Sequence, residues 1–161
     1  MNTEIEKAWA VAIKYLGYSA RTSAELQTRL ARDNFSPEVI AKTLEQCQSR
    51  GFIDDAAFAD AWVADRADRK RYGKARLGQE LRRKGIPKDT LVHALETVEP
   101  DDEFRRALAA CESKWNRVAA ADPATRSKEK QRVSSFLQRR GFGWSTIKQV
   151  FDVLMANELE G

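Results

Sequence analysis

Basic residues gather in two stretches of this 161-residue chain, and their spacing suits binding chemistry. The first stretch runs from residue 66 to residue 84 and holds nine basic residues against two acidic ones. They are Arg66, Arg69, Lys70, Arg71, Lys74, Arg76, Arg82, Arg83 and Lys84. Because the formal net charge of the whole chain is only +4, this segment alone is more positive than the protein as a whole.

A second stretch, residues 126–140, holds six basic residues against Glu129. Segregated positive charge suits a polyanion, either DNA phosphate or an acidic protein surface, because many moderate contacts add up and release counterions. The alternative is structural: basic side chains in a last helical turn also satisfy carbonyls and the helix dipole. We take as candidate partner-binding or DNA-binding residues the whole first stretch together with Lys130, Arg139 and Arg140.

Other reactive side chains give no catalytic pattern. The single histidine, His93, has no serine or cysteine nucleophile at helical spacing, and we expect it on the surface. The sequence contains no glycine-rich phosphate loop. The aspartates before Phe58 and Phe104 are expected to cap their helices or to place charge in the first turn, rather than to bind metal. We therefore expect no enzyme activity, no cofactor and no metal.

Compartment and core follow from the cysteines, the tryptophans and the N-terminus. Cys47 and Cys111 fall on apolar helical positions without a metal-ligand or redox spacing, so we expect buried free thiols in a reducing, cytoplasmic compartment. The polar N-terminus has no signal-peptide core, and the chain has no apolar run of membrane-spanning length. Trp9, Trp62 and Trp115 should pack in cores or between helices, whereas Trp144 should be exposed, because it starts a helix directly after a turn.

Apolar residues recur at helical spacing along the chain, which predicts an all-α fold. Three segments, 26–44, 77–95 and 133–151, align without a gap and carry five apolar positions each. The aligned positions are Leu26, Leu30, Phe35, Ile40 and Leu44, then Leu77, Leu81, Ile86, Leu91 and Leu95, then Val133, Leu137, Phe142, Ile147 and Phe151. We expect Leu30, Leu81 and Leu137 to be buried at equivalent positions.

A tight turn interrupts each segment at the same offset. Asn34, Gly85 and Gly141 occupy the place where a helix ends in the left-handed conformation, so we predict positive φ at all three. The following helices should start at Ser36-Pro37, at Pro87 and with Ser145 as a cap.

The spacing between segments leaves room for one further helix before each pair, over about residues 4–17, 55–71 and 101–118. This arrangement predicts three tandem three-helix repeats, over residues 1–53, 54–98 and 99–161, with an internal loop in the third at about 119–127.

Two motifs resemble a known family. Gly51-Phe52-Ile53-Asp54-Asp55, followed by Phe58 and Trp62, resembles the entry to the central repeat of RecX proteins. The stretch from Gly73 to Ile86, which contains Arg76-Leu77 and Glu80-Leu81, is similar to the family's most characteristic segment. The third segment, with Phe136-Leu137 and Gly141-Phe142, extends the resemblance over most of the chain. Asp33-Asn34 departs from the basic residue and glycine found at the equivalent positions of the other two repeats.

The resemblance implies an elongated, curved array of repeats that lodges in the groove of the RecA–DNA filament and modulates its recombinase, ATPase and coprotease activities, with inhibition expected. The expected partner is thus the RecA nucleoprotein filament, bound by a monomer. A second interpretation is a helix-turn-helix-like protein that binds single- or double-stranded DNA directly. A third is a solenoid adaptor for an unrelated acidic partner.

Overall fold

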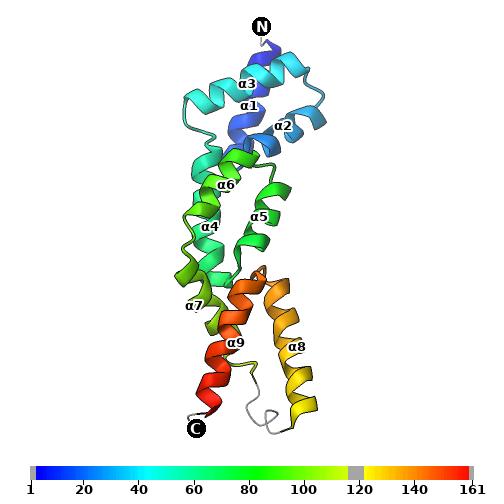
Figure 1. Cartoon of the computed structure of the whole chain (residues 1–161). Helices are drawn as coiled ribbons and strands as arrows, with labels where there is room; N and C mark the ends of the chain where they lie inside the picture. Colours follow the sequence, from blue (N-terminus) through cyan, green and yellow to red (C-terminus); the bar gives the residue numbers. More distant parts are fainter. Residues whose placement is uncertain (1–2, 116–121, 160–161) are drawn as a thin grey trace. The chain divides into compact units, whose positions relative to one another are not determined.

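The computed structural model describes residues 3–115 and 122–159, and every regular element in these ranges is an α-helix (Figure 1). The helices are α1 (Glu4–Leu16), α2 (Ser23–Arg32), α3 (Pro37–Ser49), α4 (Asp55–Lys70), α5 (Lys74–Arg83), α6 (Lys88–Glu96), α7 (Pro100–Cys111), α8 (Pro123–Arg139) and α9 (Trp144–Leu159). The all-α prediction is therefore confirmed.

The contacts between residues divide the chain into two compact units. The first unit comprises Met1–Ala61 and Leu81–Ala94. In it α1, α2 and α3 pack against one another, because each is apolar along one face. Their core consists of Ala8, Ala12, Leu26, Leu30, Ile40, Cys47 and Ile53.

The second unit comprises Trp62–Glu80 and Leu95–Gly161. Here α7, α8 and α9 pack together around a larger core that includes two aromatic side chains in contact. The ring centroids of Trp115 and Phe151 lie 5.7 Å apart. The other buried members are Ala107, Ala110, Cys111, Val133, Leu137, Phe142, Ile147, Val150 and Leu154.

The aligned leucines occupy equivalent buried positions. Leu30, Leu81 and Leu137 are each 0% exposed, which confirms the prediction and supports the gapless alignment of the three segments. Truncating such a side chain to alanine removes contacts and leaves a cavity, at a cost of about 2–5 kcal/mol. The three leucines thus mark one structural position used three times.

The three turns also share one backbone geometry. The φ angles of Asn34, Gly85 and Gly141 are 67°, 79° and 92°, so the predicted left-handed conformation is confirmed. In each turn the following residue donates its N–H to the carbonyl five residues earlier, at 3.1–3.2 Å, which closes the preceding helix. These pairs are Phe35 with Leu30, Ile86 with Leu81, and Phe142 with Leu137.

Two predictions for the third repeat were wrong, one for a helix cap and one for the end of a loop. Ser145 does not cap α9, because the helix already begins at Trp144 and the Gly143 carbonyl accepts the N–H of Ile147. The loop expected at 119–127 is shorter at its far end, because α8 begins at Pro123. The Asp122 side chain caps that start by accepting the Thr125 N–H, and hydrogen bonds from Thr125 lower the pKa of Asp122. Residues 119–121 lie outside the described ranges.

The helix expected over 101–118 ends early, since α7 finishes at Cys111 and residues 112–114 form a turn. Residues 116–118 lie outside the described ranges. The predicted repeat boundaries and the elongated, curved arrangement stay predictions. Within the described residues no helix is long and apolar enough to cross a membrane.

Several side-chain predictions are confirmed. Cys47 and Cys111 are buried free thiols, and the Asp54 side chain caps α4 by accepting the Ala57 N–H at 3.0 Å. His93 is on the surface. Trp9 and Trp62 are half-buried and Trp115 is buried, whereas Trp144 is 66% exposed.

Candidate partner-binding surface

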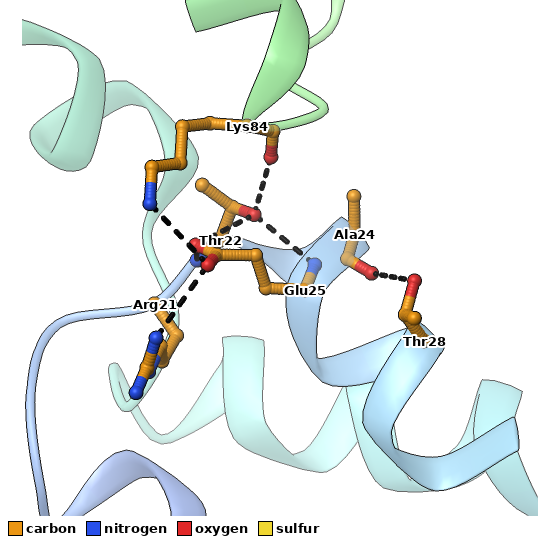
Figure 2. A network of polar contacts seen from close by, with 6 residues as sticks. All are labelled: Arg21, Thr22, Ala24, Glu25, Thr28 and Lys84. Atoms are coloured by element: carbon orange, nitrogen blue, oxygen red, sulfur yellow. Dashed lines mark hydrogen bonds and ion pairs between the residues drawn. The ribbon is translucent and has the colours of Figure 1, made fainter. Parts of the chain in front are cut away.

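The turn that follows α5 packs against the start of α2. We call this contact the first joint; its residues are Thr22, Ala24, Glu25, Lys84 and Gly85. The buried hydroxyl of Thr22 donates to the Lys84 carbonyl at 2.6 Å and accepts the Glu25 N–H at 3.1 Å (Figure 2). A Cβ on Gly85 would lie only 2.3 Å from the Cβ of Ala24, so only glycine permits this approach.

Charge is balanced in the first joint. The Lys84 ammonium and the Arg21 guanidinium each lie 3.6 Å from the Glu25 carboxylate, as Figure 2 shows. A second carboxylate, that of Asp55 at the start of α4, accepts both the backbone N–H of Ser23 at 2.9 Å and its hydroxyl at 2.5 Å. Both carboxylates also suit the positive end of the α2 dipole.

The turn between α8 and α9 packs against the start of α5 in an equivalent contact. We call it the second joint; its residues are Gly73, Lys74, Arg76, Arg140 and Gly141. Gly73 N–H donates to the Arg140 carbonyl at 2.8 Å, and Lys74 N–H donates to the buried Glu103 carboxylate at 3.1 Å. In the gapless alignment Gly73 corresponds to Thr22 and Arg140 to Lys84. A Cβ on Gly141 would lie 2.4 Å from the backbone nitrogen of Arg76.

Charge is not balanced in the second joint, because Arg76 occupies the position of Glu25. The guanidinium carbons of Arg76 and Arg140 lie 3.9 and 5.7 Å from the centroid of the Tyr72 ring. Among the described residues, neither guanidinium has a carboxylate within 4 Å, and the buried Nε of Arg140 has no hydrogen-bond partner. Two half-buried cations therefore share one aromatic ring.

Backbone carbonyls orient these two guanidinium groups. Arg76 donates to the Arg139 carbonyl at 3.3 Å, and Arg140 donates to the Lys70 carbonyl at the end of α4. The two basic stretches, far apart in sequence, thus meet at the second joint. We call the exposed and half-buried cations gathered here the basic surface; its members are Lys70, Arg71, Lys74, Arg76, Arg139 and Arg140.

The remaining candidate residues lie elsewhere or have structural contacts. Arg82, Arg83 and Lys84 belong to the first unit, the first two being exposed. Arg66 packs over Trp62 and pairs with Asp65 and Glu80, and the exposed Arg69 also pairs with Asp65. Lys130 lies on α8 with its ammonium 5.5 Å from the Phe151 ring centroid.

Sequence reasoning missed two residues of this surface. The first is Tyr72, whose ring packs against two guanidinium groups. It is an aromatic residue inside the basic run Arg71-Tyr72-Gly73-Lys74, and this interleaving of aromatic and basic residues was the available signal. Glu103, which caps α5, had no local signal because it lies 29 residues away in sequence.

The described residues hold no group of three or more histidine, cysteine, aspartate or glutamate side chains arranged to bind a metal ion.

Family models of RecX match the chain in three places. The first three-helix domain matches residues 8–47, the second residues 54–95 and the third residues 101–151. The three-repeat prediction is thereby confirmed, and each of the matches lies inside one predicted repeat.

Two similar proteins align with nearly the whole chain. Regulatory protein RecX of Mycolicibacterium smegmatis is 35% identical, with 98% of this chain and 85% of the relative covered. Regulatory protein RecX of Chlorobaculum tepidum is 31% identical, covering 91% of this chain and 88% of the relative.

A crystal structure of RecX from Lactobacillus salivarius superposes with a TM-score of 0.86 at 20% identity, covering 95% of this chain and 97% of that one, which shows a shared fold. The matched relatives are regulatory proteins and not enzymes, in agreement with the expectation that the chain does not act by catalysis. The chain therefore belongs to the RecX family of regulatory proteins.

Proposed function

We propose that this protein regulates RecA by binding the RecA–DNA filament through the basic surface at the second joint. Inhibition of the filament's recombinase, ATPase and coprotease activities is the expected direction. The proposal rests on family membership and on the placement of Lys70, Arg71, Lys74, Arg76, Arg139 and Arg140. We also propose that the protein acts as a monomer in the cytoplasm.

One observation carries the choice of surface. At equivalent positions the first joint holds Glu25 beside Lys84, whereas the second holds Arg76 and Arg140 on one ring. Two cations at one site cost stability unless an anion compensates them. The ion pairs of the first joint thus stabilise the folded state more than the two cations of the second joint do. This difference supports a role for the second joint in binding a negatively charged partner.

Direct binding to DNA is the second candidate, and Tyr72 favours it. An aromatic ring among cations is typical of single-strand binding sites, where bases stack and phosphates are neutralised. In this alternative the same residues would contact DNA without RecA.

A salt series with two substrates separates the candidates. Binding is measured on bare single-stranded DNA and on the same DNA coated with RecA, using the wild type and a Lys70→Glu/Lys74→Glu variant. If RecA is the partner, the variant loses affinity for coated DNA and no longer reduces ATP hydrolysis, while its affinity for bare DNA stays that of the wild type. If DNA is the partner, both affinities fall in parallel and decrease steeply with salt.

A matched control places the same charge changes outside the basic surface. Lys14 and Lys42 are exposed on α1 and α3 in the first unit. Lys14→Glu/Lys42→Glu should retain regulation, because it alters net charge equally without touching the second joint. Equal loss in both variants would attribute binding to net charge and contradict the proposed surface.

A further inference from the structure

A pocket lies beside α4 and α7 in the second unit, with a volume of about 370 Å³. Its lining consists of Asp68, Arg71, Asp102, Arg105, Arg106 and Ala109. Three guanidinium groups therefore border one small open pocket. Arg105 and Arg106 come from α7, whose acidic first turn gives no sequence signal of a basic site.

Arg71 adopts a backbone conformation that its side chain does not favour. The described residues include five positive φ angles, at Asn34, Gly51, Arg71, Gly85 and Gly141. Four of these positions hold the glycine or asparagine that tolerates the left-handed region, whereas Arg71 has φ 54°. An arginine occupies a position where glycine would fit with less strain, which points to a use for its side chain.

The guanidinium of Arg71 is fixed toward α7. One of its Nη atoms donates to the Ala109 carbonyl at 3.0 Å, which anchors the side chain against the wall of the pocket. A single hydrogen bond uses one of the five N–H donors of the group and leaves others to face a ligand.

Arg106 is a cation with little compensation. Its side chain is 16% exposed, and both Nε and Nη2 are buried with no hydrogen-bond partner among the described residues. Its nearest carboxylate, that of Asp68, lies 3.9 Å away and is 82% exposed, so water screens much of that attraction. An anion that enters the adjacent pocket stabilises a buried cation in this state.

Arg105 completes the set from the solvent side. Its side chain is 71% exposed and pairs with Asp102, whose side chain is 47% exposed. Exposed pairs of this kind contribute little stability, so a ligand can displace the carboxylate at small cost.

We propose that the pocket bordered by Arg71, Arg105 and Arg106 binds a phosphate oxyanion, either free or within a polynucleotide backbone. A tetrahedral phosphate presents oxygens to three guanidinium groups at once, whereas a carboxylate presents two oxygens in one plane. The inference goes beyond the proposed function and does not depend on it, because it concerns the chain alone with no RecA present.

The first arm of the test measures thermal unfolding of the full chain in sodium phosphate, acetate and chloride at matched ionic strength. Phosphate should raise Tm more than acetate or chloride, because a ligand that binds only the folded state stabilises it by mass action. The extra rise should vanish in Arg71→Gly and in Arg106→Gln.

Two controls guard against a general effect of mutation. Arg69→Gln removes an exposed arginine outside the pocket, and Asn34→Gly changes another left-handed residue; both should keep the response to phosphate. Arg71→Gly is the decisive variant if Arg106→Gln proves unstable, because glycine adopts the backbone angle of residue 71 without strain.

The second arm distinguishes the sources of phosphate by anisotropy of a labelled oligothymidylate. If backbone phosphate is the ligand, Arg71→Gly weakens oligonucleotide binding about tenfold and lowers the salt slope by about one. If free phosphate is the ligand, oligonucleotide binding is unchanged while the response of Tm is lost. An equal response to acetate, or a response retained in both pocket variants, would overturn the proposal.

Discussion

The first and second joints place a turn on the start of a helix in the same way, but they complete the contact with different groups. In the first joint a buried side chain, the Thr22 hydroxyl, bonds the Lys84 carbonyl. In the second joint the backbone N–H of Gly73 donates to the Arg140 carbonyl, so the two backbone segments approach more closely. A repeat can therefore keep its geometry while its surface chemistry changes from a balanced ion network to a pair of arginines.

The largest expected effect distinguishes the two glycines. Gly141→Ala should destabilise the second unit by about 2–4 kcal/mol, because φ is positive and the new Cβ would lie 2.4 Å from the backbone of Arg76. Gly85→Ala should also destabilise, but there the obstacle is the Ala24 methyl group.

Denaturant unfolding of a double variant tests this distinction. Ala24→Gly removes the obstructing methyl group, so Gly85→Ala/Ala24→Gly should be less destabilised than the sum of its single variants. The same approach cannot rescue Gly141→Ala, where backbone atoms stand in the way. Strict additivity in the first pair would contradict the described contact.

The second prediction concerns the hydroxyl that only the first joint uses. Thr22→Val keeps the shape but leaves the Lys84 carbonyl and the Glu25 N–H without this partner, and it should cost about 2 kcal/mol. Thr28→Val provides a control, because the Thr28 hydroxyl bonds the Ala24 carbonyl at an exposed position. Urea unfolding should give a change below about 0.5 kcal/mol for the control.

The third prediction exchanges the charges of the two joints. Glu25→Arg should destabilise by about 1 kcal/mol, since it breaks a capping box and places a third cation beside Arg21 and Lys84. Arg76→Glu should leave stability within about 0.5 kcal/mol of the wild type, because it replaces one of two neighbouring cations. Losing more stability in Arg76→Glu than in Glu25→Arg would reverse our view of which joint is adapted for binding.

The smallest effect is a change in the labelling rate of the two thiols. Burial, aided by the nearby Glu112 carboxylate, raises the pKa of Cys111 to about 11, and burial also raises the pKa of Cys47. At pH 8 both should react slowly with a thiol reagent until their unit opens. Gly141→Ala should accelerate Cys111 chiefly and Thr22→Val should accelerate Cys47, as mass spectrometry of labelled peptides would report.

The same pKa shifts fix a direction for pH dependence. Because the folded state holds the thiol protons more tightly than the unfolded chain, stability should fall as pH rises from about 9 toward 11. Replacing Cys111 by alanine should flatten that fall in a thermal scan across this range, although it lowers stability at neutral pH.

Local rules predicted most of the fold. The aligned apolar positions located Leu30, Leu81 and Leu137 in the cores, and glycine or asparagine after a helix predicted the three positive φ angles. The misplaced start of α9 at Ser145 arose because Gly143 serves at that position through its backbone alone, without a side-chain signal.

The joints were beyond local rules, because they connect residues distant in sequence. The bond from Thr22 to Lys84 spans 62 residues, and the bond from Arg140 to Lys70 spans 70. Charge runs located the basic stretches, but they could not separate Arg66, which packs on Trp62, from the exposed Arg139. Which cations meet is decided by tertiary contacts and not by composition.

The residue at each turn also decides whether that turn can make the close contact seen in the two joints. A further repeat placed before the first would need the turn at Asn34 to approach as closely as Gly85 and Gly141 do, but asparagine carries a Cβ. A further repeat placed after the third would need a free helix start at Glu129, the position that corresponds to Thr22 and Gly73, yet Glu129 lies inside α8. The turn at Asn34 and the helix around Glu129 therefore differ from the surfaces that form the two internal joints.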